Sequence, residues 1–137
     1  RIVFHTNRDL DFEIYTMAAD GSDVRAVLRA PGDDRFPTWT PDGARIVWSR
    51  FVDDQSGFDL WIMSATGANA APLVQSPFAE LHPAISSDGT TVIFQSDRIP
   101  PFSLFAMPMG GGEIQPITGR ETPGASDLQP WWSAIRP

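Results

Sequence analysis

The chain contains 137 residues, of which 42% are hydrophobic, so it suits one folded domain and excludes an intrinsically disordered chain. All ten basic residues are arginine, and the 17 aspartate and glutamate residues outnumber them, which gives a net charge of −7. Binding to phosphate groups needs clustered basic residues, so this charge excludes nucleic acid as a partner. No apolar run approaches the roughly 20 residues of a membrane-spanning helix, and the lack of cysteine excludes disulfides and thiolate metal sites.

Short strands separated by turns are predicted from the first residue onward. The chain opens with Arg-Ile-Val-Phe at 1–4, continues with Glu-Ile-Tyr-Thr-Met at 13–17, and reaches a third extended run around Val27. The same three registers recur about every 45 residues. The second set lies at 45–48, 59–63 and 73, and the third at 91–94, 103–107 and 117. Helical periodicity is absent, which favours strands throughout.

A fourth register carries an acid three residues before a proline. It begins at Asp34, Glu80 and Asp127, and in the first two copies Asp-Gly follows at 42–43 and 88–89. Asp-Gly supplies the left-handed corner of a tight turn, so each copy predicts a hairpin into the next strand. Each repeat therefore contains four short antiparallel strands, which is typical of a β-propeller blade. A β-sandwich is the alternative, but a sandwich has no reason to repeat its strand chemistry.

These motifs carry a family resemblance. The segments "RIVFHTNRDLDFEIYTMAADGSDVRAVL" and "DDRFPTWTPDGARIVWSR" resemble the repeat of TolB-type β-propellers, in which an acid precedes Pro-x-Trp-Ser-Pro-Asp-Gly. The resemblance covers nearly the whole chain and is weakest in the third repeat. In the second repeat Ile85 replaces the tryptophan of the motif. It implies six blades and a periplasmic or other extracytoplasmic location. Proteins of this kind include partner-binding modules, gating propellers of peptidases, and pectin lyases.

The resemblance also orders the strands, with the proline strand innermost in each blade. Residues 1–137 are then one half-propeller: 1–30 give strands two to four of a blade, 34–76 and 80–119 give whole blades, and 127–133 give one further innermost strand. Three blades cannot close a ring of about four to eight. We therefore expect a homodimer in which each chain's last strand completes its partner's first blade, making a six-bladed ring. The alternative is a fragment of a longer six-bladed polypeptide.

Two groups of residues are the candidate binding site at the channel mouth. The acids Asp34, Glu80 and Asp127 would present carboxylates there to a cation or a basic partner. Their structural alternative is to accept backbone N–H groups in their own turns. The residues just before the repeated prolines differ from one another, as expected where a repeat varies to suit a ligand; they are Phe36, His82 and Gln129.

No catalytic constellation is found in the sequence. Its serines lack a nucleophile-elbow motif, and two histidines in different registers do not suggest a metal site, so no catalytic residue, metal or cofactor is predicted. The expected function is therefore non-catalytic binding of a protein or peptide at the channel mouth. The alternative is a segment that gates or binds substrate in a peptidase or a polysaccharide-degrading enzyme.

Overall fold

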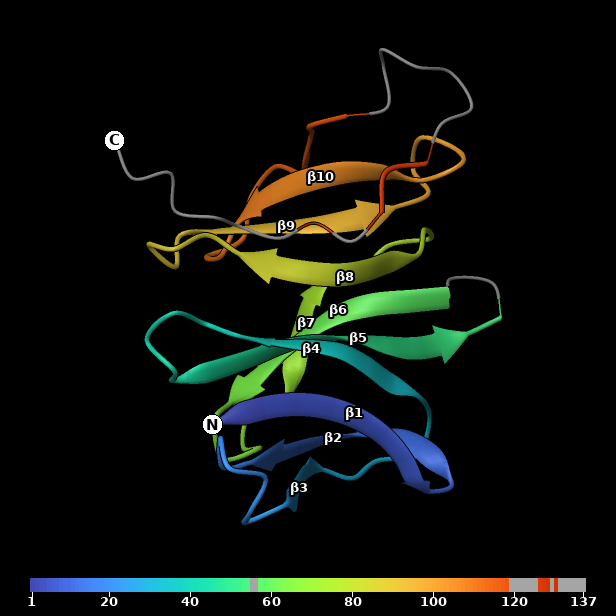
Figure 1. The fold of residues 1–137 in the computed structure, drawn as a ribbon. Coiled ribbons are helices and arrows are strands. Elements are labelled where there is room, and N and C mark those ends of the chain that lie inside the picture. Colours follow the sequence, from blue (N-terminus) through green and yellow to red (C-terminus); the bar gives the residue numbers. More distant parts are fainter. Residues whose placement is uncertain (55–56, 119–125, 129, 131–137) are drawn as a thin grey trace.

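The computed structural model describes residues 1–54, 57–118, 126–128 and 130, and these residues form an all-β arc of three antiparallel sheets (Figure 1). Within these ranges there is no helix long and apolar enough to cross a membrane. The strands are β1 (Ile2–Asp9), β2 (Asp11–Met17), β3 (Arg25–Leu28), β4 (Asp34–Trp39), β5 (Arg45–Asp53), β6 (Gly57–Ser64), β7 (Ala71–Val74), β8 (Glu80–Ile85), β9 (Thr91–Ser96), β10 (Ser103–Pro108) and β11 (Gln115–Pro116).

The strand order within each sheet is that of a propeller blade. The second sheet runs β4-β5-β6-β7 and the third β8-β9-β10-β11, so the proline-containing strand lies at one edge of each. Among the described residues the first sheet has three strands, β1-β2-β3, with no counterpart of β4 and β8. The all-β fold with blade-like antiparallel sheets is thus as the repeat predicts.

The predicted Asp-Gly hairpins are confirmed. In the first, the Gly43 N–H donates to the Thr40 carbonyl at 2.8 Å, and the Thr40 N–H donates to the Arg45 carbonyl at 2.9 Å. The Asp42 carboxylate accepts the Ala44 N–H at 3.0 Å, which holds the turn closed. Gly43 has a φ of 67°, a left-handed angle that glycine adopts without steric cost.

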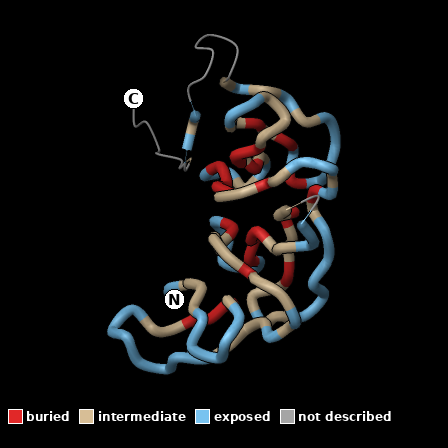
Figure 2. Tube along the Cα trace, turned by 90° about the vertical axis from the view of Figure 1, so that its right-hand side faces the viewer, coloured by how far each residue is buried: buried red, intermediate tan, exposed pale blue. Residues whose placement is uncertain are grey.

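The core consists of two clusters, one at each boundary between sheets. One joins the first two sheets through Ile14, Ile46, Trp48 and Met63, and the other joins the second and third sheets around Phe94. Figure 2 shows the buried segments gathered where the sheets face one another and the exposed segments along the outer edge. β4 packs on β1 and β2, and β8 packs on β4, β5 and β6, so each innermost strand covers the preceding blade.

Candidate functional site

The two described residues that precede the repeated prolines have an unusual backbone. Phe36 has a φ of 55° and His82 a φ of 53°. Each lies in a β-bulge, because the β4 register shifts between Arg35 and Thr38 and the β8 register shifts between Leu81 and Ala84. Proline cannot donate to the ladder, which explains why the bulge falls there. A left-handed conformation costs a bulky residue about 1–2 kcal/mol, and such strain clusters at functional sites.

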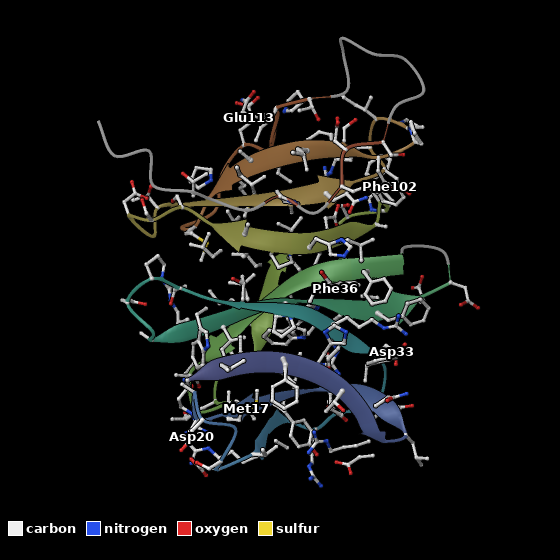
Figure 3. All side chains as sticks on the ribbon, in the orientation of Figure 1. Met17, Asp20, Asp33, Phe36, Phe102 and Glu113 are labelled. Carbon is white, nitrogen blue, oxygen red and sulfur yellow. The ribbon has the colours of Figure 1, made fainter. Side chains whose placement is uncertain are left out.

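The bulges bring four rings from four strands into one line, which we call the aromatic row: Phe12 (β2), His5 (β1), Phe36 (β4) and His82 (β8). The Phe36 and His82 rings are 3.9 Å apart between centroids, Phe36 and His5 are 5.3 Å apart, and His5 and Phe12 are 5.4 Å apart. All four residues are half-buried. The row therefore crosses both blade boundaries at the end of the strands where Phe36 and Asp33 lie, opposite Met17 and Asp20 (Figure 3).

Hydrogen bonds fix the two imidazoles of the row. His5 Nδ1 accepts the Phe36 N–H at 3.3 Å, so His5 carries its ring proton on Nε2 when neutral. His82 Nδ1 lies 2.9 Å from Oε1 of Gln95, on β9. Burial lowers the pKa of His5, and the positive charges of Arg35 and His82 lower it further. The lowered pKa favours the neutral form of His5 within the row.

Arg35 borders the row and is compensated locally. Its guanidinium lies 4.2 Å from the Phe12 ring centroid, a cation–π distance, and pairs with the Asp33 carboxylate at 2.5 Å. Burial acts to raise the pKa of Asp33, but hydrogen bonds from the Phe12 N–H and from Arg35 hold that pKa below its usual value. Asp33 thus stays ionised, and the bond from the Phe12 N–H at 3.1 Å fastens the first blade to the loop before β4.

Asp34 and Glu80 do not lie where the sequence predicts. Both side chains are 0% exposed, so they are not free carboxylates at a channel mouth, and they do not accept N–H groups in their own turns either. Asp34 accepts the Trp48 indole N–H at 2.6 Å, and Glu80 accepts the Arg98 guanidinium at 2.9 Å. Burial raises the pKa of Asp34 to about 6 and that of Glu80 to about 7. These acids hold strands together inside the blades.

The other two predicted site residues, Asp127 and Gln129, belong to the third copy of the proline register. Asp127 is half-buried, and its N–H donates to the Phe102 carbonyl at 3.0 Å, beside a parallel bridge between Ser126 and Phe102. Asp127 therefore lies beside the start of β10. Ala79 and Glu80, at the start of β8, lie beside β6 in the same way. Gln129 lies outside the described residues, as do 131–133 of the predicted strand.

Sequence reasoning missed three members of this site: His5, Phe12 and Arg35. It placed His5 in a register unrelated to His82 and took His82 to lack a clustered partner, whereas both rings contact Phe36. The available signal was the position of His5, which matches Gln95 in the third repeat, the residue that His82 contacts. Among the described residues no group of three or more His, Cys, Asp or Glu side chains is placed to hold a metal ion.

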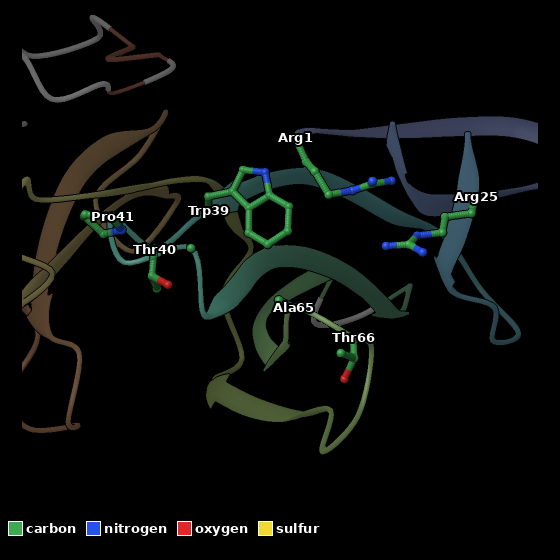
Figure 4. Close-up of a pocket in the computed structure, with 8 residues that line it drawn as sticks. Arg1, Arg25, Trp39, Thr40, Pro41, Ala65 and Thr66 are labelled. Carbon is green, nitrogen blue, oxygen red and sulfur yellow. The ribbon is translucent and has the colours of Figure 1, made fainter. Parts of the chain in front are cut away.

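A separate cavity lies at the opposite end of the strands (Figure 4). Its volume is about 520 Å³, and Arg1, Arg25 and the Trp39 ring are among its walls. Arg1 is already engaged, since its guanidinium pairs with Asp23 at 2.6 Å and donates to the Thr16 hydroxyl at 3.1 Å. This cavity shares no residue with the aromatic row.

Comparison with known proteins establishes the fold. No protein-family model matches the chain, and no curated protein matches it in sequence. Among solved structures, a putative TolB from Agrobacterium tumefaciens is 22% identical, with a TM-score of 0.74 over 84% of this chain and 44% of that one. TolB from Acinetobacter baumannii is 15% identical, with a TM-score of 0.76 over 96% of this chain and 32% of that one.

An oligogalacturonate lyase from Vibrio parahaemolyticus is also similar, at 11% identity and a TM-score of 0.60 over 85% of this chain and 36% of that one. The chain thus spans less than half the length of each of these proteins. At these identities the likeness concerns the fold alone, and that fold is the TolB-type β-propeller repeat.

Proposed function

We propose that this chain is a non-catalytic binding module that holds a protein or peptide against the aromatic row. The observation that carries the proposal is the pair of left-handed residues Phe36 and His82, which occupy one repeat position and meet ring to ring at 3.9 Å. The fold does not need these side chains there, because glycine would adopt the same backbone without strain. A costly residue kept at each bulge is expected where its side chain has a task.

The chemistry of the row suits a peptide more than a small ion. Half-buried aromatic rings and a neighbouring arginine are the groups that are enriched at the centres of protein interfaces. The row offers the half-buried rings of Phe12, Phe36 and His82 beside the Arg35 guanidinium, and Asp34 and Glu80 are buried inside the blades. An extended segment with an apolar or aromatic side chain fits these groups. The net charge of −7 would additionally draw in a basic partner from a distance.

Selection from a displayed random-peptide library tests this proposal. Phe36→Gly and His82→Gly keep the left-handed backbone and remove only the ring, so they should lose the peptides that the parent chain selects. Asn69→Gly is the matched control, because Asn69 also has a left-handed φ, of 57°, but lies in the turn after β6, away from the row. Peptides that bind both ring-deleted variants as tightly as the parent would contradict the proposal.

A second candidate function is a propeller segment that gates or binds substrate in a peptidase or polysaccharide-degrading enzyme. It is favoured by the two imidazoles, His5 and His82, that contact Phe36, because an imidazole can transfer protons near physiological pH. Incubation with oligogalacturonate distinguishes the two: cleavage that His5→Gln abolishes would support the enzyme, and no cleavage would support binding alone. An extracytoplasmic location belongs to either proposal, and cell fractionation tests it.

A further inference from the structure

The bulge at Phe36 is held by a hydrogen bond from the neighbouring blade. The Phe36 N–H, on β4, donates to His5 Nδ1, on β1, at 3.3 Å. Phe36 is strained twice, because its φ is left-handed and because the residue before a proline prefers an extended backbone. The pairing of β4 with β5 skips from Arg35 to Thr38, so Phe36 lies outside the strand ladder. The acceptor on His5 therefore helps to keep Phe36 in the conformation that brings its ring into the aromatic row.

This hydrogen bond exists in only one protonation state of His5. An imidazole nitrogen accepts a hydrogen bond only while it carries no proton, so His5 Nδ1 accepts the Phe36 N–H only when the ring is neutral. A protonated His5 carries hydrogens on both ring nitrogens, and its Nδ1–H would face the Phe36 N–H, donor against donor. The N–H of a half-buried residue would then lose its acceptor.

The other imidazole of the row lacks this property. His82 Nδ1 lies 2.9 Å from Oε1 of Gln95, an oxygen that can only accept, so His82 is the donor. Protonation of His82 adds a proton at Nε2 and leaves this bond in place. Both imidazoles contact the Phe36 ring. They differ in the role of Nδ1, which is an acceptor in His5 and a donor in His82.

The surroundings of His5 oppose its protonation. Burial lowers the pKa of His5 below its ordinary value of 6.5, and the positive charges of Arg35, on β4, and His82, on β8, lower it further. From β2, His5 faces the uncharged ring of Phe12. Arg35 is itself paired with Asp33. The bond to the Phe36 N–H is therefore fully formed above pH 6.5 and is lost as pH falls through the lowered pKa of His5.

We propose that His5 makes peptide binding to the aromatic row pH-dependent: neutral His5 holds the Phe36 ring in place for the peptide, and protonated His5 releases it. The inference rests on the proposed function and adds its regulation. Once the Phe36 N–H loses its acceptor, the residue before Pro37 relaxes toward the extended backbone that it prefers, and its ring leaves the position beside His82. A peptide that needs this ring then dissociates. The row captures its peptide at neutral pH and releases it in acid.

NMR spectroscopy of the full chain tests the switch without a peptide. The chain has only two histidines, so the ring resonances of each can be followed through a pH titration. The amide resonance of Phe36 should shift with the midpoint of His5. In His5→Asn this shift should vanish, because the Asn Oδ1 stands near the position of Nδ1 and accepts a hydrogen bond at every pH. In His82→Asn, the matched control, the Phe36 shift at the His5 midpoint should remain.

A binding measurement tests the effect on the peptide. The probe is a peptide selected on the parent chain at about pH 7.5, with blocked ends and no histidine or acidic residue, so that the peptide itself does not titrate. About one pH unit below the His5 midpoint it should bind the parent at least about fivefold more weakly, as expected when a partly buried N–H loses its acceptor. His5→Asn lacks a ring of the row and should bind more weakly at both pH values, but the ratio of the two affinities should be close to one.

Two buried acids titrate in the same range, Asp34 with a pKa of about 6 and Glu80 with a pKa of about 7. Neither accepts the Phe36 N–H, which is bonded to His5. Because His5→Asn leaves both acids unchanged, a pH dependence of binding that persists in this variant would overturn the proposal. A Phe36 amide that does not follow the His5 midpoint in the parent would overturn it as well. Failure to select any peptide would instead contradict the proposed function, and the NMR titration would still decide whether His5 holds Phe36.

Discussion

The buried carboxyl of Glu80 makes a quantitative prediction about stability. Burial raises its pKa from 4.5 to about 7, against the opposing hydrogen bonds from Ser76 and Arg98. Each pKa unit corresponds to about 1.4 kcal/mol, so the ionised form costs the folded state about 3 kcal/mol relative to the unfolded chain. Glu80→Gln keeps an acceptor for Arg98 but cannot ionise, and it should therefore remove this cost.

The sign follows from proton binding. Between pH 4.5 and 7 the folded state holds the Glu80 proton and the unfolded state has lost it, so the free energy of unfolding falls as pH rises through this window. Asp34, whose pKa is raised to about 6, acts in the same direction. His5, whose pKa is lowered, acts in the opposite direction below its ordinary value of 6.5. The difference between the parent and Glu80→Gln isolates the contribution of Glu80.

Urea denaturation at several pH values between 5 and 8 measures this difference. Glu80→Gln should gain stability over the parent as pH rises, reaching about 2–3 kcal/mol at pH 8, with little difference at pH 5. Asp88→Asn is a suitable control, because hydrogen bonds from Ser86 and Thr90 lower the pKa of Asp88 to about 2 and it stays ionised across the range. Parallel pH profiles for the parent and Glu80→Gln would refute the buried, proton-binding carboxyl.

Two further changes test the packing of the blades. Gly67→Ala should lower the free energy of unfolding, measured by thermal denaturation, by more than about 3 kcal/mol, because φ is +88° and a Cβ would lie 2.1 Å from a carbonyl oxygen of β3. Gly21→Ala is the control: φ is +86° there but no atom lies within 4 Å of the new Cβ, so the loss should be only about 1 kcal/mol. Equal losses would show that the two blades do not press together at Gly67. Trp48→Phe should lower the free energy of unfolding in urea by about 2 kcal/mol, because Asp34 loses the indole N–H that donates to it at 2.6 Å. Trp61→Phe removes an indole N–H that has no hydrogen-bond partner among the described residues, so it should cost less. The reverse order would contradict the hydrogen bond to Asp34.

The strand plan was predictable from the sequence because its signals are local. Asp42-Gly43 favours a tight turn whatever surrounds it, and the apolar run Ile46-Val47-Trp48 favours a buried strand. Both act over a few residues, and both are as predicted in the structure. The order β1-β2-β3 that the described residues give to the first sheet agrees with the family resemblance, which places Arg1–Phe4 at a second-strand position.

The site was less predictable because it depends on register and on side-chain direction. The spacing placed Asp34 and Phe36 at one end of β4. The bulge at Phe36 decides which of the two side chains is buried inside the blade, and the pattern Asp-Arg-Phe-Pro does not encode that geometry. The same bulge shifts the pairing by one residue and so brings Phe36 over His5, from another blade. Contacts between blades arise only when the sheets stack, which is why His5 escaped sequence reasoning.

β4 is part of one sheet and covers another, and this has a consequence for protein engineering. It is hydrogen-bonded to β5 in its own sheet while it packs on β1 and β2 of the sheet before it. A cut at the sheet boundary, before Asp34, would strip the cover from the first sheet. The unit to duplicate, exchange or permute is therefore residues 1–39 or residues 45–85. Each of these ranges begins at a second strand and ends with the innermost strand that covers it.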